Sequence, residues 1–544
     1  MSQMAAIPKR LFRPIPGAAA LLLSALPAMA HARAPGDAAT RCSGLAKLSL
    51  PHTTIASATP VEDPAATFKT PSLADLPAFC RVVAHVREAP DSDIAVEIWL
   101  PVDGWSGVFH GNGNGGFAGV LAGGYGSMLS GLRRHFATAT TDTGTAPATP
   151  LEGDALIGHP QKWKDWGRRS THVMTVTGKS IAQAYYGAAI RRSYYTGCST
   201  GGQQGLIEAL YYPSDYDGIL VGAPVINRTW GHAAVAWDFA AAHRSPTSFL
   251  SDDKLRLLNA ASTAYCNSHG FGFAGDAFIS DPLACRFDPQ QIACPGKTES
   301  SSCLTQAEVA AARAFYNGPS SRSGRPLFFG WPAGSEAPAR FGWSFLETPD
   351  NGGPPFGGVF KWVFGANWDW RSLDIDRDMP IVDAKLGADV NDATRGSLGA
   401  FAARGGKLII FHGLADALVP PAQSVAFYQR QARQSGGISR LKRNARLFMV
   451  PGVMHCGGGP GPDSFSSTLA GIPQPPLKDP RYDLFETLIA WTNERRSPDS
   501  IIATKFTSAA PTSIAFQRPV CAYPQTARYR GAGPLSDSAS FTCR

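Results

Sequence analysis

Hydrophobic and polar positions follow two different periods along this chain. Between about Val82 and Phe109 they alternate every second residue, which is typical of strands, most clearly from Val96 to Leu100. Helical spacing is clearest from Thr171 to Tyr186. The other elements predicted are strands at 192–196, 217–222, 407–411 and 446–450, and helices at 203–212, 422–434 and 481–493. Strands that alternate with helices predict an α/β fold whose sheet is mostly parallel and doubly wound.

The middle of the chain breaks this alternation. Residues 227–388 hold four of the ten cysteines and many aromatic side chains, and strands hardly recur there. We therefore expect a large inserted lid at 227–388, between a first core part at 33–226 and a second at 389–544.

The first residues have the pattern of a signal peptide. Lys9, Arg10 and Arg13 precede an apolar stretch at 17–26, and two small-x-small cleavage patterns end at Ala30 and Ala32. We expect 1–32 to be a signal peptide and the protein to be secreted or periplasmic. An uncleaved anchor is the alternative, but this apolar run is too short to span a bilayer and no later one is long enough.

Composition changes this picture little. The chain has 544 residues, 44% of them hydrophobic and 17% charged, which is typical of a globular protein. Its net charge of +8 falls by three units without the signal peptide, and no run of Lys and Arg marks a nucleic-acid footprint. We expect neither a nucleic-acid partner nor a membrane span.

A candidate nucleophile stands where a predicted strand meets a predicted helix. Gly197-Cys198-Ser199-Thr200-Gly201 fits the pattern G-x-S-x-G. Such a turn is strained and needs small neighbours; it lifts the serine hydroxyl clear of the sheet and aims the next N–H, that of Thr200, at a developing oxyanion. A glycine-rich turn without a catalytic role is the alternative.

A serine nucleophile needs a base and an acid that orients the base. Asp416 directly follows the predicted strand 407–411, and His455 directly follows the strand 446–450. Active sites of open α/β sheets form at such carboxyl ends of strands. Asp392 and Asp383 are weaker candidates for the acid, and we expect His412 to shape the loop.

A second oxyanion donor is expected from a loop after an early strand. The glycine-rich stretch 111–116 is that loop, since glycine lets the backbone approach a substrate oxygen closely. A phosphate cradle is the competing interpretation, but neither a Walker lysine nor a Rossmann context accompanies it.

Ten cysteines in an exported chain suggest five disulfides. Local spacing favours the pairs Cys42–Cys80, Cys266–Cys285, Cys294–Cys303 and Cys521–Cys543. That leaves Cys198 beside the candidate nucleophile and Cys456 beside the candidate base. A bridge between these two would hold the catalytic loops together, whereas a reactive Cys198 thiol is the alternative. No CxxC spacing suggests zinc.

These motifs resemble the tannase/feruloyl esterase family. The resemblance rests on Gly197 to Gly202, His412-Gly413-x-x-Asp416, and His455-Cys456 with the glycines that follow, supported by 113–119, 216–218, 303–305, 404–407 and 521–524. It implies an α/β-hydrolase core with a lid, and hydrolysis of phenolic or aromatic carboxylic esters. It further implies that Ser199 is the nucleophile, His455 the base and Asp416 the acid, that Gly116 and Thr200 form the oxyanion hole, and that Cys198 pairs with Cys456.

The resemblance leaves the metal open. Members of this family often bind calcium in the lid through an Asp-rich loop after a cysteine, but here Asn267 and Asp276 are the main candidates, with Asp281 further on. We expect no cofactor for the chemistry, and structural calcium stays a weak expectation.

The substrate stays open as well. We expect a small aromatic ester, attached or not to a sugar or polymer: a galloyl, a feruloyl or a terephthalate monoester. Trp343 and Phe345 of the lid are the first aromatic side chains to test for reading it. Another serine acyl hydrolase, such as a peptidase or lipase, and a non-catalytic scaffold that binds carbohydrate or polyphenol are the other classes.

Overall fold

A computed structural model describes residues 35–70, 73–296, 300–339, 341–349, 352–469, 471–476, 478–507 and 513–544. The predicted signal peptide at 1–32 lies outside these ranges. No helix within them is both long and apolar enough to cross a bilayer.

The core is one mixed sheet, built within the described ranges from nine strands. Their order across the sheet is β1-β2-β3-β5-β4-β6-β7-β8-β9. The pairings from β5 to β9 are parallel, whereas β1, β2, β3 and β5 pair antiparallel. The strands are β1 (Thr53–Val61), β2 (Phe79–Val86), β3 (Ile94–Pro101), β4 (Val108–Asn112), β5 (Ala137–Thr141), β6 (Arg192–Cys198), β7 (Gly218–Gly222), β8 (Lys407–Gly413) and β9 (Ala445–Val450). This is the α/β architecture that the sequence predicts.

Helices cover both faces of the sheet. Strand β8 shows why: Leu408 and Ile410 face one apolar cluster, and Ile409 and Phe411 face another. The first cluster lies under α5 (Ser170–Tyr186), α6 (Thr200–Tyr211) and α14 (Ala422–Gln434), and the second lies under α16 (Leu484–Glu494). Alternation of buried residues on a central strand therefore produces the doubly wound arrangement.

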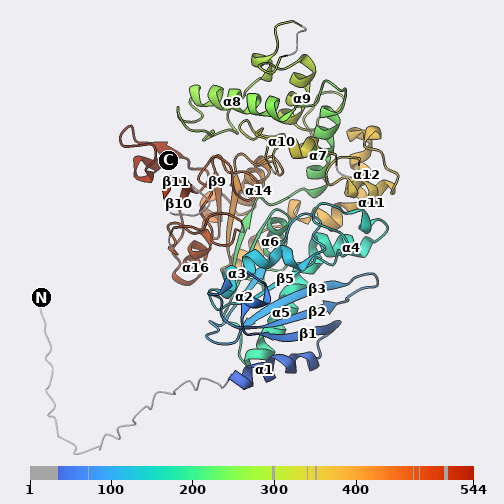
Figure 1. The fold of residues 1–544 in the computed structure, drawn as a ribbon, viewed down its shortest axis with the longest axis vertical. Coiled ribbons are helices and arrows are strands. Elements are labelled where there is room, and N and C mark those ends of the chain that lie inside the picture. The colour runs from blue at the N-terminus through green and yellow to red at the C-terminus, as the bar shows by residue number, and fades with distance from the viewer. Residues whose placement is uncertain are drawn as a thin grey trace, which may run out of the picture.

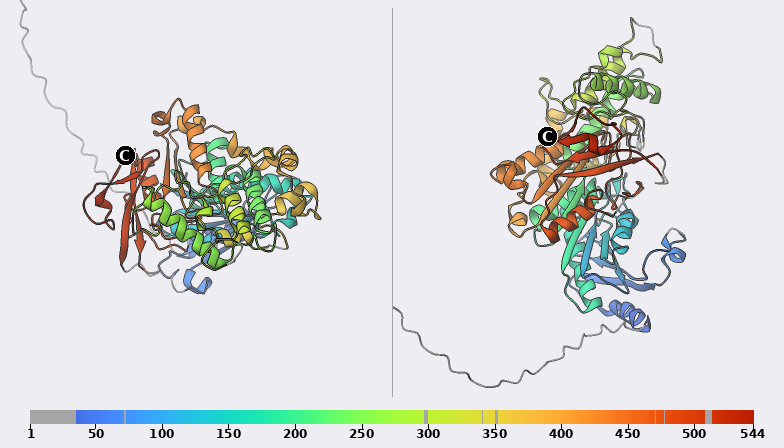
Figure 2. Two further views of the ribbon diagram at one scale, coloured as in Figure 1. Left: turned by 90° about the horizontal axis from the view of Figure 1, so that it is seen from above. Right: turned by 90° about the vertical axis from the view of Figure 1, so that its left-hand side faces the viewer.

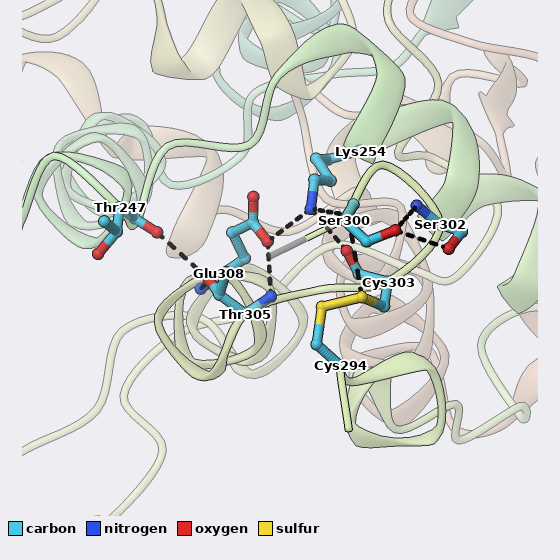
Figure 3. Close-up of a disulfide and its surroundings, with 8 residues drawn as sticks. All are labelled: Thr247, Lys254, Cys294, Ser300, Ser302, Cys303, Thr305 and Glu308. Atoms are coloured by element: carbon cyan, nitrogen blue, oxygen red, sulfur yellow. Dashed lines mark hydrogen bonds and ion pairs between the residues drawn. A yellow bond between two sulfur atoms is a disulfide. The ribbon is translucent and has the colours of Figure 1, made fainter. Parts of the chain in front are cut away.

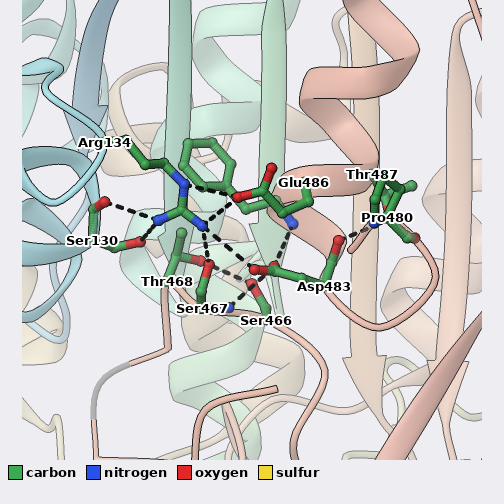
Figure 4. Close-up of polar contacts among 10 residues, drawn as sticks. Ser130, Arg134, Ser466, Ser467, Thr468, Pro480, Asp483, Glu486 and Thr487 are labelled. Carbon is green, nitrogen blue, oxygen red and sulfur yellow. Dashed lines mark hydrogen bonds and ion pairs between the residues drawn. The ribbon is translucent and has the colours of Figure 1, made fainter. Parts of the chain in front are cut away.

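A polar cluster holds α16 against the first half of the core (Figure 4). Arg134, which follows α3 (Tyr125–Leu132), donates to the carbonyl oxygen of Ser130 at 2.9 Å and to Oε1 of Glu486 at 2.7 Å. Asp483 caps α16, because its Oδ1 accepts from the N–H groups of Phe485 and Ser467 at 2.9 and 3.1 Å. Residues more than 300 positions apart in the chain are thereby fixed to each other.

After β7 the chain forms a helical module that runs from Arg228 to Val390. Its helices are α7 (Arg228–Ala242), α8 (Asp252–Ser268), α9 (Gln306–Asn317), α10 (Trp343–Glu347), α11 (Gly358–Phe364) and α12 (Ile375–Val390). Figure 1 shows α8 and α9 at one end of the molecule and β1 to β3 at the other, and Figure 2 shows the same separation from the side. The module has an apolar core of its own, in which Trp343 is fully buried against Phe315 and Tyr316.

One disulfide of this module adjoins a buried ion pair (Figure 3). The Lys254 amine donates to the carbonyl oxygens of Ser300 and Cys303 at 2.8 and 2.6 Å, and lies 3.2 Å from Oε2 of Glu308. Glu308 also accepts from the N–H of Thr305 at 2.7 Å, which completes a capping box at the start of α9. The Cys294–Cys303 bridge and this ion pair thus anchor the same loop.

The chain ends in strands that the sequence pattern does not predict. β10 (Ser500–Phe506) pairs antiparallel with β11 (Ile514–Cys521), and β12 (Ala527–Tyr529) with β13 (Phe541–Cys543). All ten cysteines lie in the described ranges, and they form the five expected pairs, including Cys521–Cys543.

Candidate active site

Ser199 occupies a strained turn between β6 and α6. Its backbone has φ 62° and ψ −121°, a conformation that a residue with a side chain rarely adopts. The glycines around it are needed for space: a Cβ at Gly197 would lie 2.7 Å from the carbonyl carbon of Gly201, and one at Gly202 would lie 2.4 Å from the oxygen of Gly222. The N–H of Ser199 donates to that same oxygen at 3.0 Å, which holds the turn on the end of β7.

Asp416 lies on the loop after β8 and is completely buried. Its Oδ2 accepts from Nδ1 of His455 at 2.8 Å, and its Oδ1 accepts from the N–H groups of Leu418 and Val419 at 2.7 and 2.9 Å. Burial would raise the pKa of this carboxyl, but the charge of His455 and the hydrogen bonds from His412 and His455 together lower it well below its usual value. The carboxylate therefore stays ionised beside the imidazole.

His412 does more than shape the loop. Its Nε2 lies 3.2 Å from Oδ2 of Asp416 and 3.0 Å from the carbonyl oxygen of Val419, so it donates toward two acceptors. Its Nδ1 lies 2.8 Å from Oγ of Ser424. This second histidine contacts the same carboxylate oxygen as His455, a contact that its sequence position alone does not indicate.

The loops of the candidate acid, base and nucleophile are tied to one another. The N–H of Ala415 donates to the carbonyl oxygen of Val453 at 2.9 Å. The disulfide Cys198–Cys456, with Cα atoms 5.9 Å apart, joins the turn of Ser199 to the loop of His455. Within the described chain, Ser199 Oγ forms no hydrogen bond with His455, a contact that often tightens only when substrate binds.

Gly116 and Thr200 lie side by side beside Ser199. The hydroxyl of Thr200 donates to the carbonyl oxygen of Gly116 at 2.8 Å, and the indole N–H of Trp166 donates to the same oxygen at 2.9 Å. Gly116 has φ 56°, and a Cβ there would lie 1.7 Å from the oxygen of Pro150, so only glycine fits. The N–H of Thr200 is the first of α6, and a helix leaves that group without an internal acceptor.

Arg228 is a buried cation next to this pair. At 3% exposure, its guanidinium donates to Thr200 Oγ1 at 3.1 Å and to Oε1 of Gln203, and it stacks over Trp166 at 4.2 Å. Burial lowers the pKa of Arg228 to about 9, and no carboxylate of the described residues pairs with it. The positive charge is therefore uncompensated at the candidate oxyanion site.

A small cavity of about 40 Å³ joins these groups. Gly116, Ser199, Thr200 and Gln423 from the core line it, together with residues of α7 and Phe356 from the inserted segment. Its walls are mostly apolar; the other lining residues include Val225, Gly231, Val235, Leu418 and Val419.

Two polar side chains of this cavity have unusual hydrogen bonding. Nδ1 of His232 lies 3.0 Å from the carbonyl oxygen of Phe356 and must therefore carry the proton. Burial, and then the charge of Arg228, lower the pKa of His232 to about 3, so the ring is neutral and its Nε2 keeps a lone pair. Among the described residues, the buried Nε2 of Gln423 has no partner, while its Oε1 accepts from the N–H of Asn227 at 3.3 Å. Sequence patterns do not single out Arg228, His232 or Gln423.

Aromatic side chains of the inserted segment extend from the base to the cavity. Phe341 lies against His455 with ring centroids 5.8 Å apart, and Phe345 contacts Phe341 and Phe356 at 5.6 and 6.0 Å. Trp343, in contrast, belongs to the module's own core and donates to Oγ of Ser335. Phe345 is thus near the candidate site, and Trp343 is not.

The candidate calcium ligands do not form an oxygen-rich shell. Asp276 is paired with Arg518 through both carboxylate oxygens, at 2.9 and 3.1 Å. The amide nitrogen of Asn267 donates to the carbonyl oxygens of Asp276 and Phe278 at 3.1 and 3.3 Å. A neutralised carboxylate and carbonyls that already accept hydrogen bonds do not fit a hard cation. Calcium binding stays an expectation from the family resemblance.

Known proteins resemble this chain over most of its length. The family model described as "Tannase and feruloyl esterase" matches residues 80–352 and 356–544. An uncharacterized esterase of Xanthomonas campestris is 35% identical, with 96% of this chain and 94% of that protein covered. The mono(2-hydroxyethyl) terephthalate hydrolase of Piscinibacter sakaiensis is 32% identical, with 87% and 86% covered. A crystal structure of feruloyl esterase B from Aspergillus oryzae matches with a TM-score of 0.81 and 26% identity, covering 93% of this chain and 100% of that one.

Proposed function

This chain belongs to the tannase and feruloyl esterase family and is a carboxylic ester hydrolase, and we propose that it cleaves esters of hydroxylated aromatic acids through an acyl-enzyme on Ser199. The main support for this mechanism is that the three loops are linked to one another. A hydrogen bond joins Asp416 to His455, and a disulfide joins the His455 loop to the Ser199 turn.

The proposed reaction has two acyl transfers. His455 takes the proton of Ser199 Oγ as this oxygen attacks the ester carbonyl, and the N–H groups of Gly116 and Thr200 stabilise the oxyanion. His455 then protonates the leaving alcohol, and afterwards activates a water that releases the acid. Asp416 holds the imidazole in the tautomer with Nδ1 protonated and stabilises the imidazolium. Arg228 adds positive charge behind Thr200.

Replacing the nucleophile tests the mechanism. We expect Ser199→Ala to abolish hydrolysis of methyl ferulate, with a melting temperature close to that of the parent, because the hydroxyl has no structural partner in the described chain. A fluorophosphonate probe should label the parent and not the variant. Turnover retained by Ser199→Ala would refute the assignment, and a parent that the probe does not label would favour a non-catalytic scaffold.

His232 supports the choice of acyl group. Its Nε2 lone pair can accept a hydrogen bond, and a phenolic hydroxyl can donate one. An ionised carboxylate has no proton to donate, so its oxygens would repel that lone pair. Gln423 Nε2 is a donor without a partner among the described residues and can bond the same hydroxyl oxygen. A phenolic hydroxyl therefore matches His232 and Gln423 better than a carboxylate does.

Substituting His232 tests this substrate class. We expect His232→Phe to lower kcat/KM for methyl 4-hydroxycinnamate about tenfold, the effect of one lost hydrogen bond, while methyl cinnamate changes little. His232→Gln, which restores an acceptor, should recover part of the loss. An equal loss on both esters, or a parent that prefers mono(2-hydroxyethyl) terephthalate, would contradict the proposal.

We also propose that the protein is exported from the cytoplasm. Disulfides are typical of extracellular proteins, and five pairs support a secreted or periplasmic location. The signal-peptide pattern at 1–32 supplies the route. N-terminal sequencing of the mature protein from culture medium or periplasm should begin close to residue 33.

A further inference from the structure

A second, larger cavity lies at the ends of the central strands that are opposite to Ser199. It is lined by residues at the amino ends of β6, β7, β8 and β9, whereas Ser199, Asp416 and His455 follow carboxyl ends of these strands. Its volume of about 710 Å³ is within the usual range of ligand sites, roughly 300–1,000 Å³. Of the described residues that line it, seven are basic: Arg192, Arg404, Lys407, Lys442, Arg443, Arg446 and Arg495.

Little negative charge balances this group. Asp217 is the one carboxylate among the described lining residues; its Oδ2 accepts from the N–H of Ser193 at 2.8 Å, and its Oδ1 is 3.9 Å from Arg192. Arg446 is built into the wall, since it donates to the carbonyl oxygen of Pro498 at 2.7 Å and lies 3.3 Å from Asp499.

The other cations are available to a ligand. Arg404, Lys442, Arg443 and Arg495 form no ion pair within the described chain, and the three arginines are exposed.

The cations are also crowded. Lys407 and Arg446 both lie over the ring of Trp491, at 5.4 and 5.2 Å, and the Lys407 amine donates to the carbonyl oxygen of Arg443 at 3.0 Å. Burial, and then the charges of Arg495 and Arg446, lower the pKa of Lys407. Like charges held this close repel one another, and a bound anion would relieve that repulsion.

We propose that this basic cavity binds an oligoanion, a short chain that carries several carboxylate, sulfate or phosphate groups. The cations come from the start of β6, the segment before β8, the segment before β9 and the end of α16, so they suit charges repeated along a chain. Five of the seven basic residues that line the described cavity are arginines, whose planar fork pairs with such oxyanions through two hydrogen bonds. The sequence alone does not show this site, because its cations come from four segments between 192 and 495 that only the fold brings together.

Titration calorimetry on the full protein tests the proposal. We expect trigalacturonate or tripolyphosphate to bind at about 0.15 M salt and to bind more weakly as salt rises. The double variant Arg404→Glu with Arg443→Glu should weaken binding about tenfold or more. Arg244→Glu with Arg325→Glu is the matched control, since these exposed arginines of the inserted segment lie outside the basic cavity and the change in net charge is the same.

The relative affinities of the two probes identify the kind of anion. The outcomes also distinguish this proposal from the proposed esterase mechanism. Tighter binding of trigalacturonate identifies an acidic polysaccharide, and tighter binding of tripolyphosphate identifies a phosphate chain; either supports the site. Failure of both probes to bind the parent, or an equal loss in the control, would overturn it. Arg404→Gln with Arg443→Gln repeats the test should charge reversal impair folding. Binding requires no turnover, and neither double variant should alter hydrolysis of methyl ferulate, so this site and the proposed esterase mechanism can fail independently.

Discussion

At the scale of single residues, buried ionisable groups set how the molecule responds to acid. Asp416 is ionised although it is fully buried, because two histidines and two backbone N–H groups surround its oxygens. A carboxyl whose pKa is lowered on folding stabilises the fold at pH values above its unfolded pKa, and this contribution is lost as the pH falls toward the folded pKa. Asp416 therefore favours the folded state throughout the neutral range.

His110 also makes the folded state less stable as the pH falls, but for a different reason. It is fully buried on β4, its Nε2 lies 2.9 Å from Thr196 Oγ1, and burial, then Arg134, lower its pKa to about 3. Between about pH 6.5 and 3 the unfolded chain binds a proton that the folded histidine does not, so stability falls as the pH falls. We expect the free energy of unfolding to drop by about 2 kcal/mol from pH 7 to pH 5 through this residue alone.

Urea denaturation at the two pH values measures this effect. His110→Gln should flatten the pH dependence by that amount, whatever its effect on stability at pH 7. His52→Gln is the control, because His52 is exposed and forms no ion pair within the described residues. A slope in His110→Gln as steep as in the parent would show that His110 is not the group that titrates.

The sequence could indicate only part of the residue-scale picture. Ser199, Asp416 and His455 follow strand ends and short motifs, so a local pattern leads to them. Arg228, His232 and Gln423 sit on ordinary helix positions, and their roles come from burial and from neighbours far away in the chain. No local pattern encodes an uncompensated charge or an unused hydrogen-bond donor.

At the scale of elements, one covalent link joins the two halves of the core. Cys198 ends β6, and Cys456 follows β9 at a sequence separation of 258. Removing this bridge releases a very long loop in the unfolded state, which in the chain-entropy model costs roughly 5 kcal/mol of stability. It also frees the turn of the nucleophile from the loop of the base.

Removing the bridge should therefore affect both stability and turnover. We expect Cys198→Ser with Cys456→Ser to lower the urea midpoint and also kcat for methyl ferulate. Cys521→Ser with Cys543→Ser is the matched control: its loop has a sequence separation of 22, so roughly 3 kcal/mol is lost, and kcat should hold. An unchanged kcat in the first variant would mean that hydrogen bonds such as Ala415 to Val453 suffice to hold the site.

The elements themselves were predictable where their periodicity was strong. The central strands β6 to β9 and helices α5, α6 and α14 begin and end within a few residues of the predicted ranges. β10 to β13 were not predicted, since they form small two-stranded sheets without a long apolar run. The helices of the inserted segment were not predicted either. Their buried faces pack against each other rather than on the sheet, so the strand–helix alternation of the core does not continue there.

At the scale of the whole molecule, the cavity beside Ser199 is shared between the core and the inserted segment. The core lines it with residues that include Gly116, Ser199, Thr200 and Gln423, and the segment 227–388 lines it with residues that include Arg228, His232 and Phe356. The proposed chemistry and the proposed selectivity therefore both draw on the two parts of the chain. The boundaries of the lid at 227 and 388 stay a prediction, since they are drawn on sequence alone.

The size of this cavity implies that a wall must move when substrate binds. About 40 Å³ is far below the roughly 300–1,000 Å³ of common ligand sites, and an aromatic acid cannot enter it unless a side chain yields. Phe356 is the candidate, because it lines the cavity, its ring lies edge-on to that of His232 with centroids 5.6 Å apart, and its backbone φ of 60° disfavours a large residue. We expect Phe356→Ala to lower KM for methyl ferulate several-fold with kcat nearly unchanged, since the core groups stay in place. Phe364→Ala, at an exposed position on α11, is the control and should change neither constant. A higher KM in Phe356→Ala would mean that this ring stacks on the substrate rather than blocking it, and the opening step would then have to be assigned to another wall.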